Sequence, residues 1–120
     1  MTNSRKYARF PMSGLVAVKV IETQSQFSGM IELISLGGVG IYTKEKLEAR
    51  TRVELQIISF SGASSLNYTL TGIVRNHDRH NEFGVVGIEF DQPVSSSDQP
   101  HLYDFLRGQE RKLSQYLATQ

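Results

Sequence analysis

The chain of 120 residues is long enough for one domain with its own hydrophobic core, and it contains no cysteine. It can therefore form no disulfide, no cysteine-ligated zinc site and no cysteine nucleophile, and a reducing compartment suits it. Thirteen Lys and Arg residues against twelve Asp and Glu residues give a net charge of +1, which argues against a protein that binds nucleic acid over a broad basic face.

Residues 1–13 are predicted to form a flexible basic arm. Three cations, Arg5, Lys6 and Arg9, occur there without an acidic residue, and Pro11 prevents a helix from continuing. An arginine guanidinium can bind phosphate through two hydrogen bonds and can also stack on a purine ring. Paired arginines on an arm suit a ligand that is both anionic and aromatic. Taken by itself, however, the arm is more simply interpreted as a basic terminus that increases solubility.

Residues 14–91 are predicted to form a small β-barrel, because short runs alternate between apolar and polar residues. The six expected strands are Leu15–Ile21, Phe27–Ile34, Val39–Thr43, Arg52–Ser59, Leu66–Asn76 and Phe83–Phe90. We expect antiparallel strands in a closed or nearly closed barrel, since an open sheet of this size would leave exposed edges. A bulge or bend is expected at Gly72, and a turn from Asn76 to Asn81.

A C-terminal helix is predicted over residues 97–119. Apolar residues recur there at helical spacing, at Leu102, Phe105, Leu106, Leu113, Tyr116 and Leu117. Ser97 or Asp98 is the expected N-cap, and Pro100 fits the first turn. One stripe of the helix is expected to lie on the end or side of the sheet, so the predicted class is mainly all-β with one helix.

A serine and three glycines join the second and third predicted strands, in the segment Ser35-Leu36-Gly37-Gly38-Val39-Gly40. Glycine lets the backbone come close to a ligand, and it adopts positive φ where a side chain would clash. A P-loop is excluded because no Gly-Lys-Ser/Thr follows, and no helix begins here as a dinucleotide fingerprint requires. Taken alone, the segment predicts a tight turn.

The arm and this turn together make a more specific pattern, Arg5-x-x-x-Arg9, then a strand pair, then Ser35-x-x-Gly38. The pattern resembles that of the PilZ family of bacterial cyclic di-GMP receptors, in which Arg-x-x-x-Arg is followed by Asp or Asn-x-Ser-x-x-Gly. The resemblance spans nearly the whole chain. It implies a six-stranded antiparallel PilZ-like β-barrel with a C-terminal α-helix.

The resemblance also implies a cyclic di-GMP site. Arg5 and Arg9 would contact phosphates and guanine faces, Ser35 would make polar contacts near them, and Gly38 would keep the strand junction open. The weaker candidates for ligand contact are Lys6, Leu33, Gly37 and Arg75. We expect no catalytic residue, no metal site and no cofactor besides the ligand, so the protein is not expected to be an enzyme.

Leu33 departs from the family pattern. It occupies the position two residues before Ser35, where the family has an acidic or amide side chain that accepts hydrogen bonds from a guanine edge. Losing a charged hydrogen bond costs roughly 1.5–3 kcal/mol, or about ten- to a hundred-fold in affinity. The neighbouring Glu32 could supply the acceptor only if a bulge shifted the strand register, and we expect no such bulge.

Other polar groups are weaker candidates. His77 and His80 flank Asp78, but their spacing in a turn does not fix a metal geometry, and no third ligand is evident. A hydrolase triad of Ser35, His77 and Asp78 lacks a nucleophile elbow and an oxyanion-hole signature. His101 is most simply a surface or capping residue.

The leading hypothesis is a stand-alone receptor or adaptor that binds cyclic di-GMP, orders its arm and signals to an unidentified protein partner. The alternative is a degenerate PilZ adaptor that binds a protein without nucleotide. An RNA-binding barrel that stacks Tyr7 and Phe10 on bases is disfavoured by the charge of +1, so no nucleic acid is expected. No apolar run approaches the roughly 20 residues of a membrane span, and no signal-peptide core follows the arm; we expect no membrane insertion and a bacterial, cytoplasmic location.

Overall fold

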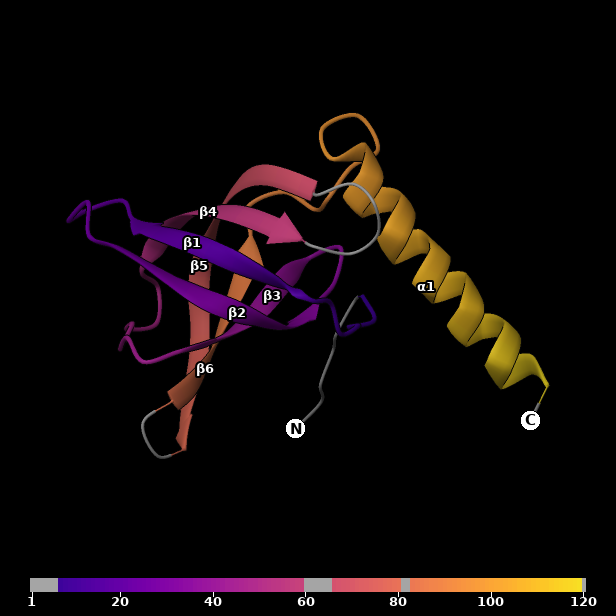
Figure 1. Cartoon of the computed structure of the whole chain (residues 1–120), viewed down its shortest axis with the longest axis horizontal. Coiled ribbons are helices and arrows are strands. Elements are labelled where there is room, and N and C mark those ends of the chain that lie inside the picture. Colours follow the sequence, from indigo (N-terminus) through magenta and orange to yellow (C-terminus); the bar gives the residue numbers. More distant parts are fainter. Residues whose placement is uncertain (1–6, 60–65, 81–82, 120) are drawn as a thin grey trace.

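Six strands and one helix form the computed structural model, which describes residues 7–59, 66–80 and 83–119. The elements are β1 (Gly14–Val20), β2 (Gln26–Ile34), β3 (Gly38–Thr43), β4 (Arg52–Ser59), β5 (Leu66–His80), β6 (Phe83–Phe90) and α1 (Pro100–Ala118). All neighbouring strands are antiparallel, and the order β1-β2-β3-β6-β5-β4 closes because β4 pairs with β1 (Figure 1). The predicted fold class, a six-stranded antiparallel barrel with a C-terminal helix, is confirmed.

The core of the barrel follows from the two-residue period of its strands. Along β4, Val53, Leu55 and Ile57 are fully buried, whereas Arg52 and Gln56, which alternate with them, are exposed. The other strands likewise point alternate apolar side chains inward, and these side chains meet in one core. The outer face carries polar residues together with exposed large side chains on β1, β2 and β3, namely Leu15, Met30 and Tyr42.

The turn predicted from Asn76 to Asn81 is wrong, because β5 continues to His80. His80 pairs with Phe83 at the start of β6, so the hairpin is longer than its sequence indicates. Asn and Asp favour turns in isolation, but here the backbone of residues 76–80 is held by pairing with β6, and the ladder overrides that preference.

The bulge expected at Gly72 lies elsewhere. Gly72 pairs in register with Val53 on β4 and with Phe90 on β6, and the register shift falls between Val74 and Asn76. Gly72 has a packing role instead, since a Cβ at this position would lie 2.4 Å from the Glu89 carbonyl oxygen. The glycine therefore permits a close approach of β5 and β6 rather than a bend.

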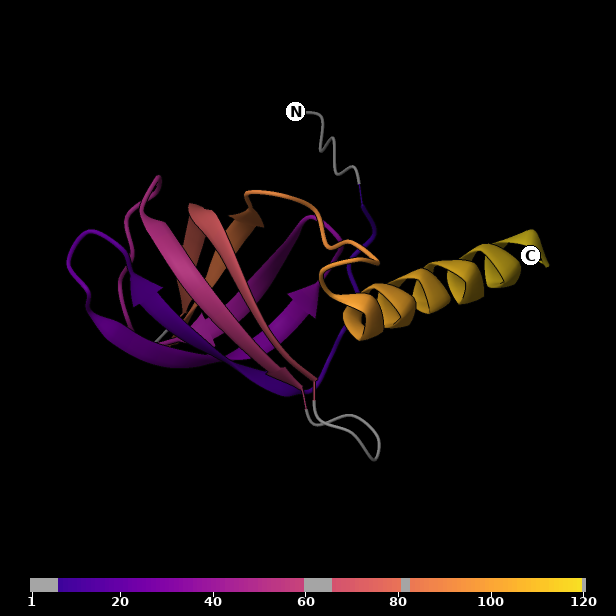
Figure 2. The ribbon, with the colours of Figure 1, turned by 90° about the horizontal axis from the view of Figure 1, so that it is seen from above.

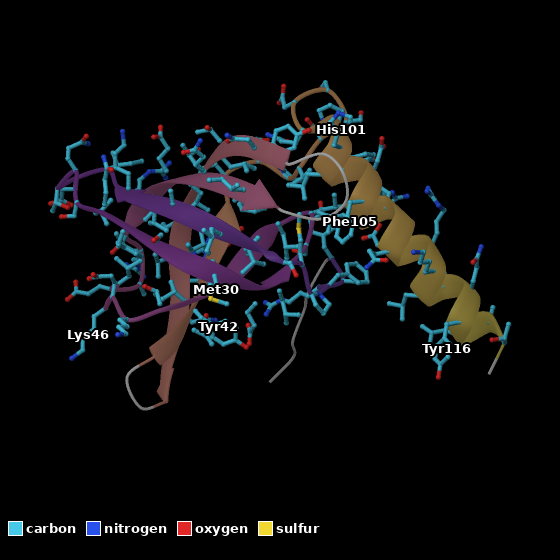
Figure 3. All side chains as sticks on the ribbon, in the orientation of Figure 1. Met30, Tyr42, Lys46, His101, Phe105 and Tyr116 are labelled. Carbon is cyan, nitrogen blue, oxygen red and sulfur yellow. The ribbon has the colours of Figure 1, made fainter. Side chains whose placement is uncertain are left out.

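Among the described residues, the side chains of α1 that are fully buried lie in its N-terminal half. Leu102 and Leu106 are fully buried, whereas Leu113, Tyr116 and Leu117 are 40–62% exposed. The helix projects from one end of the barrel (Figures 1 and 2), and its far end, marked by Tyr116, lies away from the strands (Figure 3). A helix of 19 residues is about 28 Å long, which is more than the end of this barrel covers, so the predicted apolar stripe is buried over its first half alone.

The N-cap of α1 is Gln99, so the predicted caps Ser97 and Asp98 are wrong. The Gln99 side chain makes no capping hydrogen bond; its Oε1 accepts from the Ser95 backbone N–H at 3.0 Å. The Ser95 hydroxyl oxygen in turn accepts from the Asp98 backbone N–H at 3.1 Å. These polar side chains stabilise the turn that precedes the helix, and Pro100 begins the helix without needing an N–H acceptor.

Asp91 links the end of β6 to two other strands. Its carboxylate accepts hydrogen bonds from the Thr71 hydroxyl and from the Arg52 guanidinium, both at 2.7 Å. The Thr71 hydrogen bond is the largest cause that lowers the pKa of Asp91 below its ordinary value; burial opposes it, and the charge and hydrogen bond of Arg52 add to the lowering. The ionised carboxylate therefore stabilises the fold above the unfolded-state pKa of about 3.9, and this contribution is lost as the pH falls through the folded-state pKa.

We expect Asp91→Asn to lower the thermal unfolding midpoint at pH 7, because the amide loses the charge that faces Arg52. The ion pair is partly exposed, with side-chain exposures of 56% and 30%, so the loss is below about 1 kcal/mol. Circular dichroism melts of the wild type and of the Asp91→Asn variant at several pH values measure the difference between their unfolding midpoints. We expect this difference to become smaller as the pH falls from 5 toward 2. A difference that stays constant over this range would contradict the assigned pKa shift.

Candidate ligand-binding site

One backbone bridge holds the arm against the barrel. The Phe10 N–H donates to the Ile34 carbonyl, and the Ile34 N–H donates to the Phe10 carbonyl, each at 2.8 Å. The two residues therefore pair antiparallel at the last residue of β2. Residues that flank such a pair lie opposite each other, so the backbone of Arg9 reaches Ser35, where the glycine-rich turn begins.

Ser35 shapes this turn with its own hydroxyl. The Oγ atom accepts from the Gly37 N–H at 3.1 Å and donates to the Gly38 carbonyl at 3.4 Å, and the Ser35 N–H also donates to that carbonyl at 2.9 Å. The residue is buried. Its hydroxyl is thus engaged in local structure, and a direct contact with a ligand stays a prediction.

Two glycines let the arm, the turn and β6 come together. A Cβ on Gly38 would lie 2.4 Å from the Ile88 carbonyl oxygen, so a side chain there would separate β3 from β6. A Cβ on Gly37 would lie 2.7 Å from a ring carbon of Tyr7. The Tyr7 ring therefore covers the turn and anchors the arm, a role that the sequence analysis missed although the aromatic residue stands between the two arginines.

The arginines of the arm are described in part. Arg9 is exposed beside the bridge at Phe10, whereas Arg5 and the weaker candidate Lys6 lie outside the described residues. The structure thus brings Arg9 to the turn, and the positions of the other two cations stay predictions.

Arg75 lies at the margin of this region. It is exposed on β5 at the register shift, and its Nε donates to Glu89 on β6 at 2.5 Å. Glu89 pairs with Gly38 in the β3–β6 ladder. The arginine is therefore two strands from the turn and already paired with an acid, which makes it a poorer candidate than Arg9.

A bulge in β2 changes the environment of Leu33. Ile31 pairs with Ile41 and Leu33 pairs with Gly40, so Glu32 is the extra residue, and the expectation of an unshifted register is wrong. The Glu32 carboxylate lies over Gly40, where an added Cβ would be 3.1 Å from Oε1, and it accepts from the Tyr42 hydroxyl at 3.5 Å. An acidic acceptor thus stands on the outer face next to Leu33.

The described residues give little support to a metal site or to a membrane span. The side chains of His77, Asp78 and His80 lie outside the described part of the structure. Among the residues that are described, no three His, Asp or Glu side chains are grouped as metal ligands would be. Within those same residues, α1 lacks the apolar length that a membrane crossing requires.

A model of the PilZ domain family matches residues 3–108 of the chain. No curated protein matches it. Among solved structures, the inhibitor of motility MotI/DgrA from Bacillus subtilis has a TM-score of 0.72 at 16% identity over 92% of this chain. The PilZ domain of YcgR from Escherichia coli with cyclic di-GMP has a TM-score of 0.64 at 18% identity over 97% of this chain.

The complex of MrkH with cyclic di-GMP from K. pneumonia is also similar, with a TM-score of 0.62 at 17% identity over 93% of this chain. The chain spans 98% of the YcgR structure but 54% of MotI/DgrA and 57% of MrkH, so about half of each of those two proteins has no counterpart in the aligned region. At these identities the likeness concerns the fold.

Proposed function

The chain belongs to the PilZ domain family, and from this we propose that it is a receptor or adaptor that binds cyclic di-GMP between its arm and the Ser35–Gly38 turn. The observation that carries the proposal is the bridge between Phe10 and Ile34, which sets Arg9 beside the turn. The similar YcgR and MrkH structures each contain cyclic di-GMP, and this supports the choice of ligand.

In this proposal the arm supplies charge to the ligand and the turn supplies shape. Arg9, with Arg5 on the same arm, supplies guanidinium groups that can pair with phosphate oxygens and stack on guanine. The turn supplies shape, because the missing side chains of Gly37 and Gly38 let the Tyr7 ring and β6 pack against it and hold it beside Arg9. Binding would fix the arginines of the arm over the turn, and the arm with its ligand would be the surface that a protein partner reads.

Calorimetric titration with cyclic di-GMP tests this proposal, with GMP as the control because it carries the same base without the cyclic pair of phosphates. We expect saturable heat with cyclic di-GMP alone. Absence of heat at high ligand concentration would favour the second candidate, an adaptor that binds a protein without nucleotide. The observation that favours this candidate is Leu33 at the position where the family carries an acceptor.

We further propose that Glu32 supplies the acceptor for the guanine edge. The β2 bulge sets its carboxylate on the outer face beside Leu33, and the Tyr42 hydroxyl holds it. A carboxylate can accept hydrogen bonds from two neighbouring N–H groups of guanine, whereas leucine can accept none. The function proposed for Glu32 therefore compensates for the departure at Leu33.

Glu32→Gln is expected to weaken cyclic di-GMP binding by about ten-fold, because hydrogen bonds to a charged acceptor are worth roughly 1.5–3 kcal/mol and the amide keeps one oxygen. Glu22→Gln makes the same change at an exposed turn residue at the other end of β1, and it should bind as the wild type does. Titration of both variants measures the difference. Equal affinities would place the guanine edge away from Glu32.

A further inference from the structure

A shallow groove of about 490 Å³ lies between the arm and α1. Its residues are Ala8 from the arm and Arg107, Glu110, Arg111, Leu113, Ser114 and Gln115 from the helix. Figures 1 and 2 show the arm and α1 at the same end of the barrel. The groove thus borders the proposed ligand site, and none of these helix residues is among those expected from the sequence to contact the ligand.

The helix wall of the groove is basic, and the arm contributes Ala8 to the opposite wall. Arg107 and Arg111 stand four residues apart on one face of α1, and Arg9 directly follows Ala8 on the arm. The one acidic residue of the groove, Glu110, is already paired with Arg107 at 2.7 Å. Among the described residues, no hydrogen bond or ion pair engages Arg111, which leaves its five N–H donors to solvent or to a ligand.

A guanidinium on the wall of a groove attracts an anion and can pair with two of its oxygens. We propose that α1 forms a second wall of the ligand site, with Arg111 binding a phosphate of a cyclic dinucleotide whose other side is held by Arg9. This inference rests on the proposed function. It extends the site from the arm and the barrel to the helix. The bound ligand would then link the arm to the exposed half of α1.

Two neighbouring substitutions on α1 separate this role from a general effect of charge. Arg111→Gln and Lys112→Gln each remove one positive charge from an exposed helix position, but the groove includes Arg111 and not Lys112. We expect Arg111→Gln to weaken cyclic di-GMP binding about ten-fold, the effect of losing a charged hydrogen bond. Lys112→Gln should change it less than about two-fold, as a screened surface charge does.

Calorimetric titration of the wild type, both helix variants and Arg9→Ala gives distinguishable outcomes, with circular dichroism melts to establish that each variant is folded. Arg111→Lys should recover part of the affinity, since it restores the charge without the planar fork. If Arg9→Ala loses binding while Arg111→Gln binds as tightly as Lys112→Gln, the inference is overturned and the proposed function stands. Absence of binding by the folded wild type overturns both.

Discussion

Replacing Arg9 with alanine is expected to weaken cyclic di-GMP binding by about a hundred-fold. The substitution removes charge-assisted hydrogen bonds worth roughly 1.5–3 kcal/mol and a guanidinium stacking contact worth about 0.5–2 kcal/mol. A combined loss of about 3 kcal/mol corresponds to two powers of ten in the dissociation constant. The backbone bridge at Phe10 does not depend on the Arg9 side chain, so the arm should keep its place on the barrel.

Lys46→Ala is the control for this experiment. Lys46 is an exposed cation between β3 and β4, and it lies apart from the arm (Figure 3). Its replacement should leave the affinity unchanged within about two-fold. Equal affinities of the Arg9→Ala and Lys46→Ala variants, measured by calorimetry at moderate salt, would show that the arm does not hold the ligand.

Gly38→Ala is expected to lower the free energy of unfolding by about 1–3 kcal/mol, the usual cost of forcing a methyl group into packed structure. The added Cβ would lie 2.4 Å from the Ile88 carbonyl oxygen, which belongs to the backbone of β6 and cannot rotate away. β3 and β6 would have to separate at the turn. Ligand affinity should fall with stability, because Ser35 donates to the Gly38 carbonyl in that turn.

Gly108→Ala makes the same chemical change where the structure has room. An added Cβ would meet one atom of the flexible Arg111 side chain, at 4.0 Å. Alanine favours a helix interior over glycine by up to about 1 kcal/mol, so this variant should be more stable than the wild type. Urea unfolding of the two variants should thus give shifts of opposite sign, and a stable Gly38→Ala variant would refute the steric account of the turn.

The alternation of apolar residues was sufficient to predict the barrel, because each strand buries one face. Along β4, for example, Val53, Leu55 and Ile57 all point into the core. The β2 bulge could not be predicted in this way. Ile31 and Leu33 both pair with β3, and the extra residue between them, Glu32, carries no glycine or proline signal. Its position is set by how two strands fit together.

The candidate site likewise has one part that the sequence predicts and one part that it does not. The spacing of Ser35 and Gly38 is readable because both residues act within one short turn, through a hydroxyl that bonds locally and a position with no room for a side chain. The groove beside α1 joins Ala8 to Arg111, which are about a hundred positions apart in the chain. Sequence periodicity carries no information on such a contact, nor on how far α1 extends beyond the barrel.

The other expectations depend on the proposal that cyclic di-GMP binds where the arm meets the turn. The most direct test is an NMR titration that follows backbone amide shifts of the folded protein as cyclic di-GMP is added. We expect saturable shifts in residues 7–10 and 35–38, with little change at the Thr23–Ser25 turn between β1 and β2. Shifts confined to other surfaces, or none with ligand in large excess, would contradict it.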